Sequence, residues 1–351
     1  MKRTVKIIAP LVWLCVLLSG CDAWMGGEYI SVTPHEARSE PYADRVIEVT
    51  SYTQLRNAIT NLVRTGAENG VISISAFNQG TIHFYVDTAI SNVIENTAFG
   101  AYAVEKITYE IGTNRGTSVV ACRIHYRPGN QLPNKIAKIE SVGQFEEMIK
   151  KALDEGDASV LVYMEQYEKL NIEEIVDSYA KLFPDRVVEI PEVKVESYPE
   201  KGAERIVQVC FNYQTDAILM HQKRSAIEDA FRAAELSVNN ISDPAAICEQ
   251  LYLYLMGKTE IKEIQGTMPA YDVLVREVGD RESLAVVYAR MCNRAGLSCS
   301  VVSGTRDGKP WTWNVVRFRD KDYLVDLIHS YESQTFLLNR VDQVFGYIPE
   351  K

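Results

Sequence analysis

The sequence contains no CxxC motif and no cluster of cysteine and histidine at the spacing of zinc ligands. It also has no glycine-rich phosphate-binding loop, so we expect no metal site, no nucleotide site and no cofactor. Basic residues are the minority, with 37 Lys and Arg against 47 Asp and Glu and a formal net charge of −10. Such an acidic chain favours neither nucleic acid nor an anionic membrane face as its partner.

The N-terminus carries the longest apolar run of the chain. Three basic residues precede an almost unbroken apolar stretch over 7–18, and Leu18-Ser-Gly-Cys21 follows it. This order is typical of a secretory signal, and the run is too short for a transmembrane helix. The Leu-Ser-Gly-Cys ending resembles the bacterial lipobox, in which the cysteine is acylated and becomes the mature N-terminus. The resemblance implies a signal peptide over 1–20, a lipid on Cys21 and an extracytoplasmic location at the bacterial cell membrane.

The segment 21–44 mixes Gly, Ser, Pro and charged residues and is expected to be a tether. Loss of residues 1–20 removes three basic and no acidic side chains, so the formal charge of −10 becomes −13. Beyond the signal and the anchor, five cysteines remain, most simply as buried thiols. The sequence leaves open whether any of them pair in disulfides: Cys122, Cys210, Cys248, Cys292 and Cys299.

Residues 45–127 and 136–214 share one order of expected elements, which indicates an internal duplication. In each, a serine (Ser51 or Ser141) precedes a helix, and a β-rich run, a second helix and two strands follow. The alternation of apolar residues in the final strands matches at a constant offset of 87, which aligns Tyr126 with Tyr213. We therefore predict two tandem β-α-β-α-β-β modules. The second helices are expected over 88–99 and 172–183, and the strand pairs over 103–112 with 117–126 and 187–197 with 204–213.

From about residue 225 the pattern becomes helical, with a helix that ends at Gly296 and strands expected over 297–303, 312–318 and 323–327. The whole chain is thus predicted to be α+β. The motifs Gly279-Asp-Arg-Glu-Ser-Leu-Ala285, Trp311-Thr-Trp-Asn314 and Tyr323-Leu-Val-Asp326 are similar to those of bacterial transglutaminase-like domains, which have a papain-like fold. The resemblance covers about 225–335 and leaves 336–351 as a C-terminal tail.

Members of that family carry a catalytic cysteine in Gly-x-Cys-x-Gly-Tyr-Ala, a histidine in His-x-Trp-Asn and an aspartate in Trp-Tyr-x-Val-Asp. Matched on these motifs, the cysteine position holds Arg281, the histidine position holds Trp311, and Asp326 keeps the aspartate. A thiolate is the nucleophile in this chemistry, and the aspartate only orients the histidine. Arginine cannot act as a nucleophile, and the indole N–H cannot accept a proton. The resemblance therefore implies a degenerate triad and a pseudoenzyme.

Other residues could replace the lost groups. Ser283 with His329 is the best alternative pair, and Cys299 lies on a strand that could reach the cleft. We also expect Asp326, which lacks its histidine, to accept a hydrogen bond from Trp311, Arg281 or both, because an unpaired buried carboxylate is costly. The alternative is that Arg281 turns outward to its acidic neighbours in the sequence.

These features favour a membrane-anchored extracytoplasmic lipoprotein whose transglutaminase-like domain binds or scaffolds a peptide, protein or cell-wall ligand. The alternatives are an acyl-transfer or peptide-hydrolysing enzyme with a relocated nucleophile, and a structural subunit of an envelope assembly. Fold alone does not choose among them.

Overall fold

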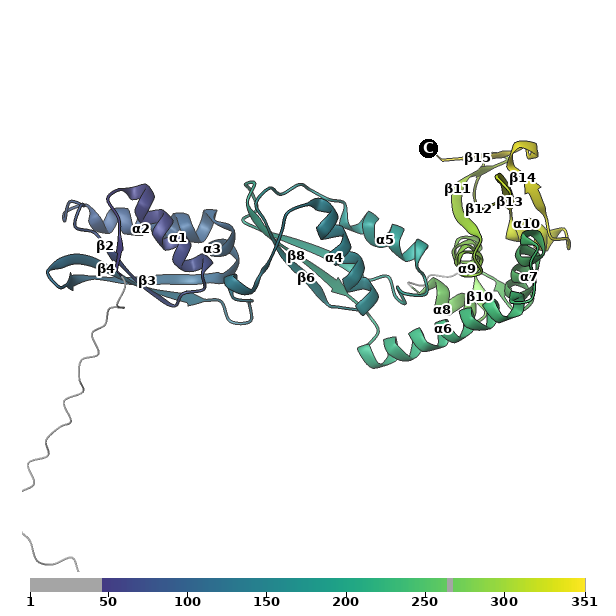
Figure 1. The fold of residues 1–351 in the computed structure, drawn as a ribbon, viewed down its shortest axis with the longest axis horizontal. Helices are drawn as coiled ribbons and strands as arrows, with labels where there is room; N and C mark the ends of the chain where they lie inside the picture. The colour runs from purple at the N-terminus through teal and green to yellow at the C-terminus, as the bar shows by residue number, and fades with distance from the viewer. Residues whose placement is uncertain (1–45, 264–267, 351) are drawn as a thin grey trace, which may run out of the picture. The chain divides into compact units, whose positions relative to one another are not determined.

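The computed structural model describes residues 46–263 and 268–350. Figure 1 shows their helices and strands in chain order. The expected signal peptide, Cys21 and the tether lie outside the described residues. Within the described ranges, every helix is too short or too polar to cross a bilayer. The cysteines at 122, 210, 248, 292 and 299 are free.

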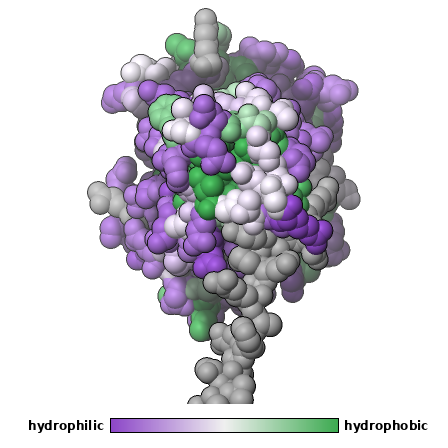
Figure 2. All heavy atoms as spheres, turned by 90° about the vertical axis from the view of Figure 1, so that its left-hand side faces the viewer, coloured by the Kyte–Doolittle hydropathy of each residue, from purple (hydrophilic) through white to green (hydrophobic). Residues whose placement is uncertain are grey.

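The first module is a four-stranded sheet of order β1-β2-β4-β3 with helices packed on it (Figure 1). β1 is parallel to β2, and β4 is antiparallel to both β2 and β3. Figure 2 shows one face of the molecule, on which hydrophilic residues surround a small hydrophobic group. The elements are β1 (Val46–Glu48), α1 (Tyr52–Arg64), β2 (Asn69–Ser73), α2 (Ile82–Asn96), α3 (Ala98–Ala103), β3 (Val104–Asn114) and β4 (Thr117–Tyr126).

The second module repeats this sheet in the order β5-β6-β8-β7, with the same parallel and antiparallel pairings. Ile72 pairs with Val120 in the first module and Val162 with Val207 in the second, which reproduces the offset of 87 between the last strands. A short 3₁₀ helix, η1 (Pro133–Lys135), precedes the second module. Its elements are β5 (Ala137–Ile139), α4 (Val142–Glu155), β6 (Ser159–Met164), α5 (Ile172–Leu182), β7 (Glu192–Tyr198) and β8 (Arg205–Asn212).

The first helices of both modules begin with the same contacts. Ser51 Oγ accepts from Gln54 N, and Ser141 Oγ accepts from Gln144 N, each at 3.3 Å. Each glutamine side chain accepts in turn from the backbone N–H before the serine, at 2.7 Å in the first module and 2.8 Å in the second. These reciprocal caps satisfy free N–H groups at the helix start, which explains why the serine pattern located both helices.

The C-terminal domain combines helices with a five-stranded sheet of order β14-β13-β12-β11-β15 and a two-stranded pair, β9 with β10. The chain is therefore α+β, as predicted. The helices are α6 (Ala217–Val238), α7 (Pro244–Met256), α8 (Pro269–Leu274), α9 (Arg281–Arg294), α10 (Leu327–Glu332) and the 3₁₀ turn η2 (Val341–Gln343). The strands are β9 (Glu260–Ile261), β10 (Val278–Gly279), β11 (Ser298–Arg306), β12 (Lys309–Phe318), β13 (Lys321–Val325), β14 (Leu338–Arg340) and β15 (Tyr347–Pro349).

Several boundaries differ from the sequence-based expectation. Helix α2 begins at Ile82 rather than 88, and α3 occupies residues just before the expected strand. Residues 187–191 precede β7 and are not strand, because the Val187 N–H donates to the Phe183 carbonyl at 3.0 Å in the turn after α5 and not to a neighbouring strand. Helix α6 begins at Ala217, where Asp216 caps it through Leu219 N at 2.9 Å. The expected tail 336–351 contributes β14 and β15 to the sheet.

Aromatic residues join the two modules. Phe99 of α3 lies with its ring 4.6 Å from that of Tyr163 on β6, and Tyr102 lies 5.4 Å from Tyr198 on β7. Tyr163 and Ile206 belong to the apolar cluster of the first module although they lie on strands of the second. The outer face of the second sheet is therefore part of the core between the modules.

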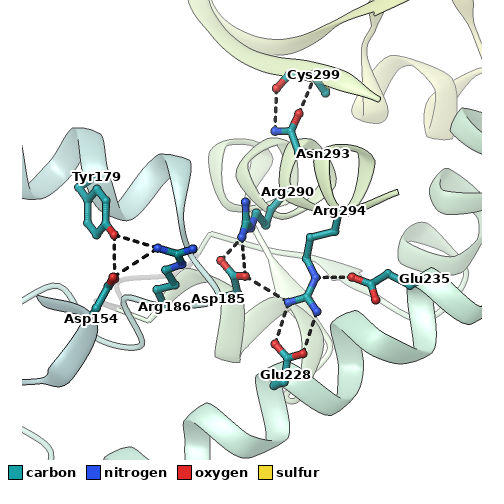
Figure 3. A network of polar contacts seen from close by, with 10 residues as sticks. All are labelled: Asp154, Tyr179, Asp185, Arg186, Glu228, Glu235, Arg290, Asn293, Arg294 and Cys299. Carbon is teal, nitrogen blue, oxygen red and sulfur yellow. Dashed lines mark hydrogen bonds and ion pairs between the residues drawn. The ribbon is translucent and has the colours of Figure 1, made fainter. Parts of the chain in front are cut away.

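A network of charged side chains joins the second module to α9 (Figure 3). Asp185, which follows α5, accepts from Nε and Nη2 of Arg290 at 2.8 Å each and from Arg294 Nη1 at 3.1 Å. Arg294 also binds Glu228 and Glu235 of α6. Its interaction with Glu228 raises the pKa of the Arg294 guanidinium. Asp185, Arg290 and Arg294 can remain mostly buried because each is paired, whereas Glu228 and Glu235 are partly exposed. The network fixes the C-terminal half of the helix whose first turn lies at the candidate site.

Candidate functional site

The three family positions come from separate elements that meet at one end of α9. Arg281 is the first residue of α9, Trp311 lies on β12, and Asp326 follows β13. Helix α9 begins there because the Asp280 carboxylate accepts from Ser283 N at 2.8 Å. The antiparallel pairing of β12 with β13, in which Asn314 faces Val325, brings Trp311 and Asp326 to the same end of the sheet.

Asp326 is almost fully buried, with 1% of its surface exposed. Its Oδ2 accepts from Trp311 Nε1 at 2.7 Å, from the Tyr347 hydroxyl at 2.7 Å and from Arg306 Nη1 at 3.3 Å. Its Oδ1 accepts from His329 N at 2.9 Å and so caps α10. The expected hydrogen bond from Trp311 is confirmed. With four donors, the carboxylate is satisfied although it is buried.

Arg281 does not reach Asp326. Its guanidinium carbon lies 3.5 Å from the centroid of the Trp311 ring, and Nη1 donates to the Pro310 carbonyl at 3.3 Å. Of the two donors expected at Asp326, Trp311 alone supplies the hydrogen bond, and the alternative of a pair between Arg281 and Asp280 or Glu282 is wrong. Stacking is preferred because a flat guanidinium is attracted to an indole face and loses little hydration there. Arg281 thus covers the indole that binds Asp326.

Two residues of this site, Arg306 and Tyr347, were not predicted from the sequence. Arg306 ends β11, and its guanidinium carbon lies 5.1 Å from the Trp311 ring. Tyr347 belongs to β15, whose pairing with β11 matches Arg306 to Tyr347. Burial, followed by the hydrogen bond to Asp326, raises the pKa of Tyr347 above its ordinary value. Both residues donate hydrogen bonds to Asp326, the carboxylate that would bind a histidine in the family that this domain resembles.

The structure places the two members of the alternative pair in different surroundings. Ser283, 7% exposed, lines a cavity of about 190 Å³ together with residues of the second module such as Ala180 and Ile190. His329 Nδ1 instead lies 3.0 Å from Arg306 Nη2. No hydrogen bond joins Ser283 to His329 within the described ranges. The structure therefore does not bring the two members of this pair together.

The thiols near the site are held in surroundings that do not activate them. Cys299 is 8% exposed, and the Asn293 side chain binds both its backbone N–H and its carbonyl, at 2.8 and 2.9 Å (Figure 3). Complete burial raises the pKa of Cys292 well above its ordinary value. A reactive cysteine needs an accessible thiol. Both of these thiols are buried.

Within the described ranges, no group of three or more His, Cys, Asp or Glu side chains could hold a metal ion. The candidate site does have a cavity of about 250 Å³, lined by Arg281, Trp311 and residues of β11, β12 and the C-terminal segment. A larger cavity of about 820 Å³ lies in the second module between α4 and α5.

No protein-family model matches this chain, and no curated protein matches it. Four chains of solved structures do match. One is a TGase, at 11% identity and a TM-score of 0.28, with 55% of this chain and 59% of that one covered. Another is a candidate protease from Parabacteroides distasonis ATCC 8503, at 8% identity and a TM-score of 0.24, with 73% of this chain and 39% of that one covered. This chain thus spans about three fifths of the first and two fifths of the second. At these TM-scores, neither structure informs its activity.

Proposed function

We propose that this protein is a lipid-anchored extracytoplasmic protein that binds a peptide, protein or cell-wall ligand at a transglutaminase-like cleft that has no catalytic activity. The observation that supports this most is the group formed by Arg281, Trp311 and Asp326. Where the family has its nucleophile and base, this chain has a guanidinium stacked on an indole. The aspartate that would orient the base is used instead as an acceptor for Trp311, Tyr347 and Arg306.

The anchor is proposed from the Leu-Ser-Gly-Cys21 motif. Diacyl chains on Cys21 would hold the protein at the membrane, since each buried CH₂ contributes about 0.8 kcal/mol. Metabolic labelling with a fatty acid tests this proposal. Label should enter the unmodified chain and be absent from Cys21→Ala, and equal label in the two would contradict it.

Binding is tested by sedimentation of the full chain, in detergent, with insoluble purified peptidoglycan. The expected result is co-sedimentation that Arg281→Glu greatly reduces, because this substitution reverses the charge on the cavity wall. Arg123→Glu is the matched control, since Arg123 is an exposed arginine of β4 outside the cleft. Sedimentation that is absent, or equal in all three proteins, would contradict a cell-wall ligand at this cleft.

Catalysis is tested in parallel, because an acyl-transfer enzyme with a relocated nucleophile is the competing function. The full chain is incubated with casein and a fluorescent primary amine, and incorporation of the amine is measured. We expect none above a boiled control. Incorporation that Ser283→Ala abolishes would support the enzyme instead.

A further inference from the structure

The cavity beside Arg281 and Trp311 contains charged groups that have no opposite charge bound to them within the described ranges. It measures about 250 Å³ and lies between the first turn of α9, the ends of β11 and β12 and the last described residues of the chain. A cavity of this size suits a small polar group better than a folded protein segment. The charges on its walls therefore indicate which group it takes.

Arg281 supplies the only positive charge on the cavity walls among the described residues. Among the described residues, its guanidinium donates only to the Pro310 carbonyl, through Nη1 at 3.3 Å, and it forms no ion pair. A guanidinium has five N–H donors. The stack on Trp311, at 3.5 Å, fixes its plane. The remaining donors of the two Nη atoms thus have the fork geometry that binds a carboxylate with two parallel hydrogen bonds.

Four carboxylates line the same cavity, and two of them are already in use. Asp280 caps α9, and Glu282 pairs with Lys181 at 2.8 Å. Glu263 and Glu350 form no ion pair with any described residue. Among the described residues, the walls therefore offer one cation and three carboxylates without an ion pair, because the backbone N–H bound to Asp280 does not neutralise its charge; Ser303 and Thr312 line the cavity beside them. A simple anion such as phosphate would be repelled by the carboxylates, whereas a group that carries both charges can pair with Arg281 and with a carboxylate at once.

We propose that this cleft binds an α-amino acid group, in which an ammonium and a carboxylate stand on one carbon. The carboxylate of the ligand pairs with Arg281, and its ammonium lies between Glu263 and Glu350. The assignment rests on the proposed function, since it names the ligand class of the same cleft. The group occurs in free amino acids and also at the unblocked end of a diamino acid side chain within a peptide.

Isothermal titration calorimetry of the full chain in detergent, with glycine and L-lysine, tests the chemistry. Binding of the free amino acids is expected, and at least tenfold weaker binding of N-acetylglycine and of glycinamide, each of which lacks one of the two charges. Nε-(acetyl-alanyl)-L-lysine distinguishes the sources, because it carries the same group on a short peptide. Tighter binding of this compound than of glycine assigns the site to a peptide-borne group, and the reverse order assigns it to free amino acids.

Variants locate the binding. Arg281→Gln and Glu350→Gln should each weaken binding of glycine at least tenfold. Glu332→Gln, which changes an exposed carboxylate of α10, should leave it unchanged. Glu350 lies in the last described residues, so its substitution tests the site even if Arg281→Gln does not fold. The absence of heat with every amino acid would overturn the proposal, as would equal binding of the capped compounds or unchanged binding by Glu350→Gln.

The peptidoglycan sedimentation separates the two proposals. Sedimentation that depends on Arg281, without binding of any amino acid, would overturn the ligand class and leave the proposed function standing. Amino acid binding without sedimentation would support the ligand class and contradict a cell-wall ligand.

Discussion

Two buried aspartates stabilise different parts of this molecule, and they do so by different means. Asp326 accepts from an indole, a phenol and a backbone N–H at 2.7–2.9 Å and from one guanidinium at 3.3 Å. Asp185 accepts from two arginines, from Arg290 at 2.8 Å and from Arg294 at 3.1 Å. Asp185 belongs to a network of opposite charges that joins two parts of the chain. Asp326 is bound mainly by neutral donors that also form the candidate site.

The difference indicates how a buried carboxylate can act purely as a structural acceptor. A histidine beside an aspartate can exchange a proton, whereas the indole of Trp311 and the hydroxyl of Tyr347 hold theirs at neutral pH. Four donors leave the Asp326 carboxylate no role except as an acceptor. We therefore expect the substitutions below to separate a carboxylate that maintains the site from one that maintains an interface.

The largest effect is expected for Asp326→Ala, because it removes the α10 cap and leaves three side-chain donors without their acceptor. Breaking a buried group of this kind costs about 3 kcal/mol of unfolding free energy. Urea unfolding of the full chain, followed by tryptophan fluorescence, measures it. Asp322→Ala, an exposed aspartate of β13, should cost about 0.5 kcal/mol or less. Equal losses in the two variants would mean that Asp326 has no special structural role.

A smaller loss, about 2 kcal/mol, is expected for Asp185→Ala, because Arg294 keeps Glu228 and Glu235 as partners. Proteolysis between the second module and the C-terminal domain should also become faster. The control is Asp322→Ala, which removes an exposed ion pair with Arg317 at 3.8 Å and should cost about 0.5 kcal/mol or less. If the control costs as much as Asp185→Ala, the network contributes no more than a surface pair.

The smallest effect is expected for Tyr347→Phe and depends on pH. At pH 8 the lost hydrogen bond should cost about 1 kcal/mol. The folded pKa of Tyr347 is raised, so the stability that it contributes is present below the ordinary tyrosine pKa of about 10 and is lost as pH rises above it. The loss should therefore shrink between pH 8 and pH 10.5. Tyr331→Phe, an exposed tyrosine of α10, should show no such trend, and a constant loss for Tyr347→Phe would contradict the assignment.

The module fold could be predicted because its signals are local. The Ser51 and Ser141 caps and the alternation in β4 and β8 are contacts between residues close in the chain or on one strand. Helix α3 was missed because it has only six residues, all apolar or glycine, which alternation and helical spacing do not distinguish. It begins where Thr97 caps it through Gly100 N at 3.2 Å.

The site was predicted only in part, because several of its contacts join residues that are far apart in the sequence. The motif positions gave Trp311 and Asp326 as neighbours, and the cost of an unpaired carboxylate then predicted their hydrogen bond. Tyr347 could not be found this way, because it reaches Asp326 only through the pairing of β15 with β11, about forty residues earlier in the chain. The position of Arg281 depends on a side-chain conformation that the sequence pattern does not specify.

We propose that the cleft binds its ligand without forming a covalent intermediate. Mass spectrometry tests this proposal most directly, after the full chain is incubated separately with iodoacetamide and with p-nitrophenyl acetate. The expected result, read by peptide mapping of the folded protein, is no adduct on Cys299 or Ser283 with either reagent, because both side chains are buried; Cys210, which is partly exposed, serves as the internal control for alkylation. One adduct per chain on Ser283 or Cys299, formed by the folded protein and not by protein unfolded before the incubation, would contradict this proposal.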